Sequence, residues 1–210
     1  MYEGERFFLR ANRLGLKLVS ADTERLDVFL RRRLEGFPED DVPTGLTGMD
    51  YRNVGVDFGF SYRHKLPWAT LFGAIAQDVS GTSKGGEINL GLFHDWQHGR
   101  LLLRPSASVS WRSAKLNDYY YGVRPAEATA DRPAYAPGPG FDTSLGLNAS
   151  VAVSADWQLL AGVSVTALSR TVRDSPVVND RVVPALSVGA IYDFGSHKPL
   201  ADESAAPAYK

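Results

Sequence analysis

Hydrophobic and polar residues alternate one by one along most of this chain. Between residues 53 and 63, Val54, Val56, Phe58, Phe60 and Tyr62 alternate with Gly55, Asp57, Gly59, Ser61 and Arg63. A period of two places successive side chains on opposite faces of a β-strand, whereas a helix needs a period of about 3.6 residues. The same alternation marks further segments at 25–34, 67–78, 86–97, 101–112, 141–153, 157–166 and 186–194. Segment 5–20 is either one long strand or two short strands that turn near Asn12 and Arg13, so the sequence predicts an all-β protein with nine or ten visible strands.

The connections between these strands alternate between tight turns and longer loops. We expect tight turns at 21–24, 64–67, 98–99 and 154–156, and longer loops at 35–52, 79–85, 113–139 and 170–180. This order is typical of an up-and-down outer-membrane barrel, whose tight turns face the periplasm. The sequence therefore predicts an antiparallel up-and-down transmembrane β-barrel, with ten to twelve strands in the complete protein. A soluble ligand-binding barrel is the alternative, and it would place the apolar rows inside.

Large aromatic residues flank the predicted tight turns. They are Tyr62, Trp68, Trp96 and Trp157. Amphipathic rings at one level around a barrel form the girdle that lies at the lipid headgroups. We therefore predict that these four residues form an interfacial girdle and that the chain lies in the outer membrane of a Gram-negative bacterium.

Composition narrows the function classes. The 210 residues carry a formal net charge of −1 and include no cysteine. A near-neutral balance argues against a nucleic-acid partner, which favours a concentrated basic surface. The absence of cysteine excludes disulfides and thiolate metal sites. The mean hydropathy of −0.19 is no argument against a membrane, because every second residue of a barrel strand faces the lumen.

The residues predicted to face the lumen are mostly small. Glycine, serine, threonine and alanine predominate, with Asp57, Arg63, Arg104 and Arg112 among them. Small polar side chains suit the narrow interior of a barrel with few strands. We therefore expect a lumen that passes nothing larger than an ion.

No set of residues predicts catalysis. His94 and Asp95 are neighbours on a predicted strand, so their side chains point to opposite faces and cannot form a hydrogen-bonded dyad. A lipid hydrolase would need a serine, a histidine and an acid at one depth of the barrel, and the sequence offers no such set. We predict a protein that is not an enzyme and that has no catalytic residues, cofactor or metal.

The loop at 113–139 carries an unusual cluster of aromatics. Tyr119, Tyr120 and Tyr121 are consecutive at its start, and Tyr135 lies near its end. Such clustered rings either fold back over the barrel mouth or mark a binding surface. Both interpretations stay open, with packing slightly favoured.

The same loop carries a family resemblance. The run Asn117-Asp118-Tyr119-Tyr120-Tyr121-Gly122-Val123, followed by Glu127-Ala128 and Arg132-Pro133-Ala134-Tyr135, closely resembles the MipA/OmpV family of outer-membrane proteins. Asp174-Ser175-Pro176-Val177-Val178 resembles that family's last external loop, and Tyr192-Asp193-Phe194 its closing strand. Tyr2-Glu3-Gly4 with Phe7-Phe8 resembles a segment that follows a signal peptide and one or two strands, so the resemblance spans nearly the whole chain.

The resemblance implies a barrel over residues 1–194 and a Pro/Ala-rich tail over 195–210, which we expect to be disordered and periplasmic. Met1 to Arg6 lack the basic start and apolar core of a signal peptide. We therefore expect the signal peptide and the first strand or strands to be missing from this sequence, which leaves an unpaired edge.

The family's namesake joins a lytic murein transglycosylase to a murein synthase. The resemblance therefore implies a non-enzymatic scaffold for periplasmic murein enzymes, with a lytic transglycosylase and a penicillin-binding protein as partners. Outer-membrane lipid and lipopolysaccharide would surround it. The alternative is a small-solute channel or surface receptor involved in envelope stress or antibiotic response.

Overall fold

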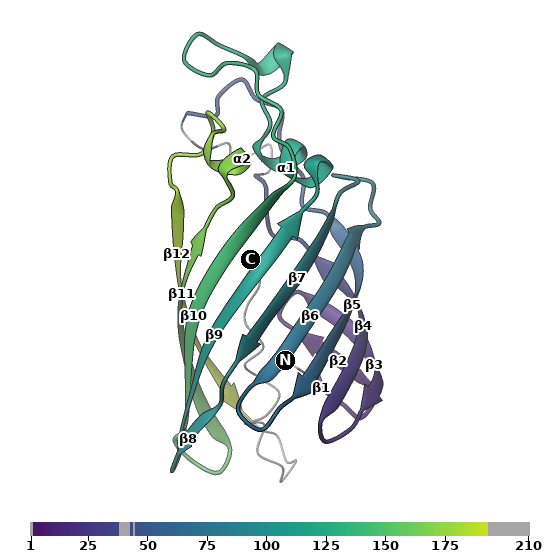
Figure 1. The fold of residues 1–210 in the computed structure, drawn as a ribbon, viewed down its shortest axis with the longest axis vertical. Helices are drawn as coiled ribbons and strands as arrows, with labels where there is room; N and C mark the ends of the chain where they lie inside the picture. The colour runs from purple at the N-terminus through teal and green to yellow at the C-terminus, as the bar shows by residue number, and fades with distance from the viewer. Residues whose placement is uncertain (1, 38–42, 44, 193–210) are drawn as a thin grey trace.

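A computed structural model describes residues 2–37, 43 and 45–192, and one antiparallel sheet dominates it (Figure 1). The strands are β1 (Tyr2–Glu3), β2 (Phe7–Arg10), β3 (Arg13–Ser20), β4 (Glu24–Arg32), β5 (Val56–Lys65), β6 (Thr70–Asp78), β7 (Gly86–Phe93), β8 (Trp96–His98), β9 (Leu101–Arg112), β10 (Gly140–Ala152), β11 (Trp157–Ala167) and β12 (Val182–Tyr192). The helices are α1 (Ala114–Tyr121), the 3-10 turn η2 (Pro125–Glu127) and α2 (Arg170–Arg173).

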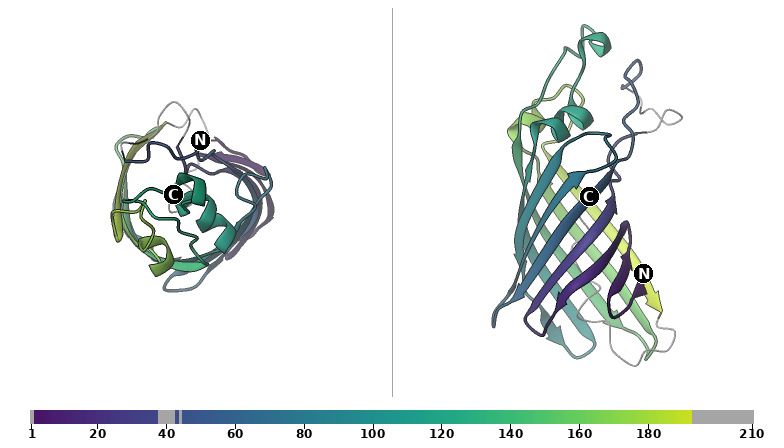
Figure 2. Two further views of the ribbon diagram at one scale, coloured as in Figure 1. Left: turned by 90° about the horizontal axis from the view of Figure 1, so that it is seen from above. Right: turned by 90° about the vertical axis from the view of Figure 1, so that its right-hand side faces the viewer.

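The sheet curves into a barrel wall in which each strand pairs with its neighbour in sequence. Its order is β1-β2-β3-β4-β5-β6-β7-β9-β10-β11-β12, with β8 attached to β9. Seen from above, the strands form a ring with α1 lying across it (Figure 2). From β3 onward, tight turns lie at one end and the longer loops at the other, so the predicted barrel class and loop alternation are confirmed. Within the described part of the chain, the end strands β1 and β12 do not pair with each other.

Twelve strands lie in the part of the chain that the structure describes. Segment 5–20 forms two strands, β2 and β3, which turn at Ala11 and Asn12. The short strands β1 and β8 are additional to the nine or ten predicted. The residue opposite the gap between β7 and β8 is Pro105, which accepts a hydrogen bond from the His94 backbone at 3.1 Å. A proline has no N–H to return, so the ladder is interrupted there and the predicted strand 86–97 becomes two.

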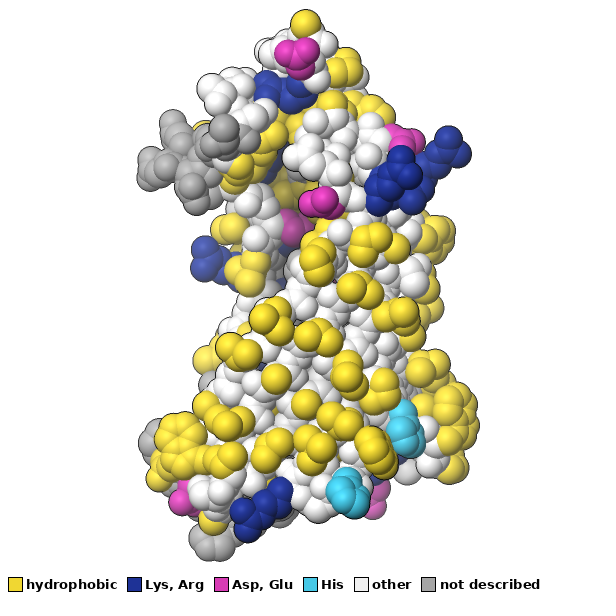
Figure 3. Space-filling view, turned by 90° about the vertical axis from the view of Figure 1, so that its left-hand side faces the viewer, with side chains coloured by type: hydrophobic (Ala, Val, Ile, Leu, Met, Phe, Trp, Pro, Cys, Tyr) yellow, Lys and Arg dark blue, Asp and Glu magenta, His cyan; other side chains and the backbone are white. Residues whose placement is uncertain are grey.

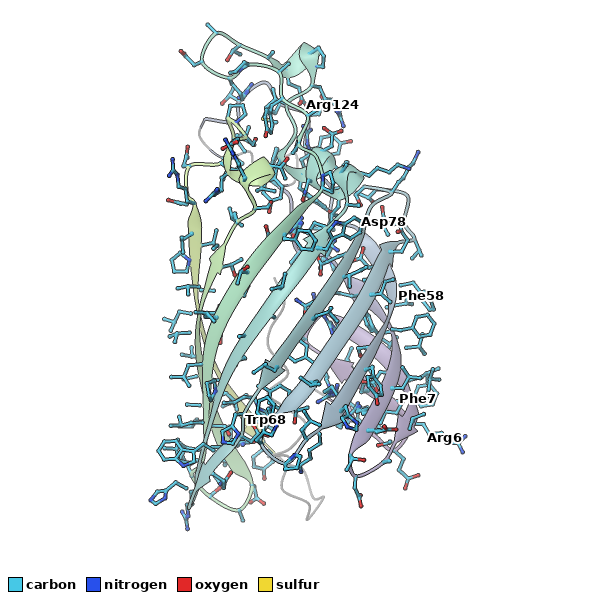
Figure 4. All side chains as sticks on the ribbon, viewed as in Figure 1. Arg6, Phe7, Phe58, Trp68, Asp78 and Arg124 are labelled. Atoms are coloured by element: carbon cyan, nitrogen blue, oxygen red, sulfur yellow. The ribbon has the colours of Figure 1, made fainter. Side chains whose placement is uncertain are left out.

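The two faces of the wall differ as the alternation predicts. On β4, Asp27 and Arg31 face inward and are 1% and 4% exposed, whereas the outward Leu30 is 44% exposed. Outward apolar side chains cover the middle of the wall, and charged side chains gather toward its two ends in the view of Figure 3. Phe58 projects outward from β5 in the same way (Figure 4). In a soluble protein the apolar side chains face inward and the polar ones outward. The reverse arrangement here suits contact with lipid.

None of the helices in the described residues combines the length and apolar character that crossing a bilayer requires.

Inward-facing phenylalanines lie over glycines of the neighbouring strand. Phe29 of β4 is paired with Gly59 of β5, and a Cβ at Gly59 would lie 2.6 Å from the Phe29 ring and 2.4 Å from the Ile75 carbonyl oxygen. Phe8 and Gly15 repeat this arrangement on β2 and β3. The aromatic ring covers the backbone that a glycine leaves bare, so these glycines are required by packing.

This contact gives a first prediction. Gly59→Ala is expected to lower the free energy of unfolding by about 1–3 kcal/mol, because the added methyl group overpacks the Phe29 ring. Gly189→Ala is the matched control, because no heavy atom lies within 4 Å of a Cβ built there. Denaturant titration of the purified chain in detergent micelles measures both values. Equal stability of the two variants would contradict the packing role of Gly59.

Short helices lie in two of the segments predicted as loops, α1 and η2 in 113–139 and α2 in 170–180. The loop predicted at 113–139 begins with the eight-residue helix α1. Ser113 caps it, since its side chain accepts a hydrogen bond from the Leu116 backbone N–H at 3.3 Å. Serine before a helix is a recognised start signal, but eight residues are too few to display a clear period of about 3.6.

Candidate functional site

A layer of buried ion pairs fills the lumen near its long-loop end. Asp57 accepts hydrogen bonds from Arg31 at 2.6 Å and from Arg33 at 2.8 Å. Glu87 lies 3.3 Å from Arg31 and 3.1 Å from Arg33, and Glu35 lies 2.6 Å from Arg112. We call this set the ion-pair layer; its members are Arg31, Arg33, Glu35, Asp57, Glu87 and Arg112. Three guanidinium groups balance three carboxylates, so the layer is neutral as a unit.

A second charged cluster lies near the tight-turn end of β4. Glu3 binds three cations there, with Arg10 at 2.6 Å, Lys17 at 2.7 Å and Arg25 at 3.1 Å. Asp27 adds a second carboxylate, 2.8 Å from Arg25. Paired charges of this kind can be buried because each desolvated group gains a partner and hydrogen bonds.

The helix α1 covers the mouth of the barrel above the ion-pair layer. Its residues Leu116 and Asn117 are fully buried. Asn117 accepts a hydrogen bond from Arg112 at 3.1 Å and donates one to the Gly138 carbonyl at 2.9 Å. The helix is therefore joined both to the ion-pair layer and to the far end of its own loop.

The predicted tyrosine cluster lies on and beside this helix. The Tyr119 hydroxyl accepts a hydrogen bond from the Asn53 backbone N–H at 2.9 Å, and Tyr120 is 7% exposed. The Tyr121 ring stacks on the Arg112 guanidinium at 5.3 Å. Burial, with the charge of Glu35 nearby, raises the pKa of Tyr121 to about 12. Tyr121 is therefore a neutral phenol at physiological pH.

Tyr135 lies at the far end of the same loop. Its hydroxyl donates a hydrogen bond to the Thr171 carbonyl at 2.8 Å, which joins this loop to α2. The four tyrosines thus have packing contacts at the mouth, and their role in recognition stays a prediction.

The external loops are joined to one another through Glu127. Its carboxylate receives hydrogen bonds from Arg52 at 2.8 Å, from the Asp50 backbone N–H at 3.0 Å and from the Arg124 backbone N–H at 2.9 Å. Arg124 also pairs with Asp50 in these loops, which project beyond the barrel (Figure 4). Burial alone would raise the pKa of Glu127, but these donors outweigh it and lower the pKa to about 2. The 35–52 and 113–139 loops therefore form one bonded platform.

The depressed pKa gives a prediction for acid conditions. The folded pKa lies below the ordinary value of 4.5, so the stabilising effect of Glu127 is complete above pH 4.5 and is lost as the pH falls toward about 2. NMR chemical shifts of the Asp50 and Arg124 amides should report this titration with a midpoint near 2. The transition should be missing in Glu127→Gln. A midpoint near 4.5 would show that the network does not hold the charge.

A cavity of about 530 Å³ lies beside the ion-pair layer, against the inner faces of β9 to β12. Its wall is built from inward-facing small polar residues, and Glu35, Glu87, Arg112, Tyr121 and Asp142 line it as well. The wall residues, taken along the strands, are Ser106, Ser108 and Ser110; Ser144, Gly146 and Asn148; Gly162, Ser164 and Thr166; and Ala185 and Ser187. The lumen thus has a charged, filled half and a hydroxylated, hollow half.

The residues predicted to face the lumen do so. Asp57, Arg104 and Arg112 are 1%, 1% and 6% exposed on the inner face, and Arg63 is half-buried. Arg104 pairs with Asp95 at 2.8 Å, so Asp95 makes a structural contact, while its neighbour His94 is exposed. Sequence reasoning missed three buried partners of arginines: Glu35 pairs with Arg112, Glu87 with Arg31 and Arg33, and Glu127 with Arg52. The sequence around a single glutamate on a polar face or in a loop does not indicate which residue that glutamate contacts.

The predicted girdle residues are exposed on the outer face. Tyr62, Trp68, Trp96 and Trp157 are 43%, 62%, 58% and 46% exposed. Each lies beside a tight turn, as Trp68 does in Figure 4. Their position at a lipid interface stays a prediction. Among the residues that the structure describes, no group of three or more His, Asp or Glu side chains is placed to hold a metal ion.

Comparison with known proteins agrees with this architecture. The family model described as MltA-interacting protein MipA matches residues 1–194. The chain is 29% identical over 195 residues to the MltA-interacting protein of Escherichia coli, which covers 92% of this chain and 79% of that protein. It is 28% identical over 180 residues to the outer membrane protein OmpV of Vibrio cholerae, covering 85% of this chain and 70% of that protein.

A third relative is matched over a shorter stretch. The outer membrane protein Omp26La of Vibrio anguillarum is 31% identical over 140 residues, which is 67% of this chain and about half (54%) of that protein. The family match spans nearly the whole chain, its relatives are outer-membrane proteins, and the wall is apolar outside and polar inside. This chain belongs to the MltA-interacting protein MipA family of outer-membrane β-barrels.

Proposed function

We propose that this barrel is a non-enzymatic scaffold that contacts a murein-cleaving lytic transglycosylase through its tight-turn side. The observation that carries the proposal is the match of 92% of the chain to a relative whose name states an interaction with MltA. A murein synthase of the penicillin-binding type is the second partner that such a scaffold would hold.

The barrel geometry supports this role. The ion-pair layer fills one half of the lumen, α1 covers its long-loop mouth, and the outer wall presents apolar side chains for anchoring in lipid. The tight turns carry exposed charges of both signs, including Asp22, Lys65, Arg100 and Asp156. If the long loops face outward, as in other outer-membrane barrels, these turns meet the periplasm, where murein enzymes act.

Binding to a purified lytic transglycosylase tests the proposal. The full chain in detergent micelles should retain the enzyme on an affinity column. Alanine substitution of the four turn charges should weaken retention, because polar contacts at an interface rim set encounter and orientation. A control removes one loop charge, Asp131, which is exposed at the opposite end. Absence of retention, or equal retention by the turn and loop variants, would count against a periplasmic docking role.

The cavity beside the ion-pair layer favours a second candidate, a small-solute channel or surface receptor. Its volume of about 530 Å³ lies in the range of small-molecule sites, roughly 300–1,000 Å³. Reconstituted planar bilayers separate the two possibilities. Conductance steps would identify a channel, whereas ligand binding without conductance would identify a receptor.

A further inference from the structure

One carboxylate in the lumen differs from all those described above. Asp142 of β10 is 6% exposed and lines the cavity. Its one hydrogen bond within the described residues comes from the Ser169 backbone N–H at 2.7 Å, and none of the ion pairs among those residues includes it. By contrast, Asp57 and Glu87 each contact two arginines. The ion-pair layer is neutral without Asp142, so Asp142 gives this end of the cavity an excess negative charge.

An uncompensated buried carboxylate is costly. Desolvation disfavours its charged form unless a cation or several donors replace the lost water. A cation delivered into the cavity would supply what the chain itself does not. The charge therefore selects against anionic ligands and favours cationic ones.

A second acceptor that lines the cavity, on β7, has no hydrogen-bond donor among the described residues. Asn89 of β7 is 3% exposed, and its amide donates a hydrogen bond to the Ser110 hydroxyl at 2.6 Å. Its Oδ1 atom is buried and accepts no hydrogen bond within the part of the chain that the structure describes. Strand pairing aligns Asn89 with Ser110 and Ser110 with Asp142, so the two acceptors lie in one row. Two strand spacings, about 10 Å at the backbone, separate them.

The wall below this row is a surface of hydroxyl groups. Ser108, Ser144 and Thr166 are aligned across β9, β10 and β11, and the Ser144 and Thr166 hydroxyls bond at 2.8 Å. Ser106 and Ser164 lie in the next row, on either side of Gly146. Hydroxyls both donate and accept, so this surface suits a ligand that itself carries several hydroxyl groups.

We propose that this cavity binds a small hydroxylated primary amine. The ammonium group would contact the Asp142 carboxylate, and a second donor of the ligand would reach Asn89 Oδ1. The remaining ligand hydroxyls would lie against the serine rows. This proposal names a ligand class for the receptor candidate and is independent of the scaffold role.

Glucosamine and glucose form a matched pair of probes, because they differ in the ammonium group that Asp142 would recognise. Isothermal titration of the full chain in detergent micelles should show saturable binding of glucosamine that is about tenfold or more tighter than that of glucose, because hydrogen bonds to charged groups are the strong ones. Asp142→Asn should reduce glucosamine binding to the level of glucose. Asp156→Asn, an identical change at an exposed turn, should leave it unaltered.

The Asp142→Asn variant is expected to fold. Asparagine can still accept the Ser169 hydrogen bond, and removing an unpaired charge relieves desolvation, so Asp142→Asn should be at least as stable as the wild type. Asn89→Leu serves as a second variant and should weaken glucosamine several-fold while leaving Asp142 in place.

The outcomes separate cleanly. Preference for glucosamine that is lost in Asp142→Asn supports the site. Equal binding of both sugars, no binding of either, or full binding by Asp142→Asn overturns it. Failure of sugar binding leaves transglycosylase retention unaffected, and failure of retention leaves the cavity measurement unaffected, so the two proposals are tested separately.

Discussion

Replacing Asp57 by asparagine is expected to lower the free energy of unfolding by about 3–5 kcal/mol, because it leaves two guanidinium groups buried without their shared anion. Asp57 is 1% exposed and accepts hydrogen bonds from both Arg31 and Arg33. Glu87 would then face both arginines alone. Denaturant titration in micelles, followed by tryptophan fluorescence, measures the loss.

Asp22→Asn is the control for this change. Asp22 is exposed in the tight turn between β3 and β4, so the same loss of one carboxylate there should alter stability by less than about 0.5 kcal/mol. Comparable losses in the two variants would mean that net charge, rather than the ion-pair layer, sets the stability. A gain in stability for Asp57→Asn would show that desolvation of the layer outweighs its pairing.

The barrel wall was predictable because its signal is local. Alternation along β5 places Phe58 and Phe60 outside and Asp57 and Gly59 inside, and no distant residue is needed to read it. Loop lengths are equally local, and their alternation predicted the up-and-down order of the strands. The exceptions have physical causes that a simple period does not capture. Pro105 of β9 interrupts the ladder that β9 forms with β7 and β8, and α1 is too short to show its own period.

The lumen contacts could not be predicted in the same way. Arg33, Asp57 and Glu87 lie on three different segments, and their meeting depends on barrel curvature and on which side chains reach across the interior. The polar face of a strand looks alike whether a charge is paired or not. Asp142 shows this most clearly, since it lies on the inner face of its strand as Asp57 does but has no cation partner among the described residues. What distinguishes Asp142 is the set of residues around it in the fold, and its position in the sequence does not reveal that set.

The outer face offers the second large effect, because it distinguishes lipid contact from water contact. Leu90 lies at the centre of the outward row on β7, between Ile88 and Leu92, and is 62% exposed. Leu34, which follows β4 at the long-loop end, is 61% exposed.

If water covered the barrel, Leu90→Arg and Leu34→Arg would both leave the free energy of unfolding nearly unchanged, since both leucines are equally exposed. In lipid, arginine near the bilayer midplane costs about 2–4 kcal/mol, and about 0–1 kcal/mol near the interface. Unfolding titrations in lipid vesicles should therefore show a large loss for Leu90→Arg alone. Equal losses would remove the case for a lipid-facing wall, and the same pair measured in micelles of shorter detergents should show a smaller difference as the apolar layer thins.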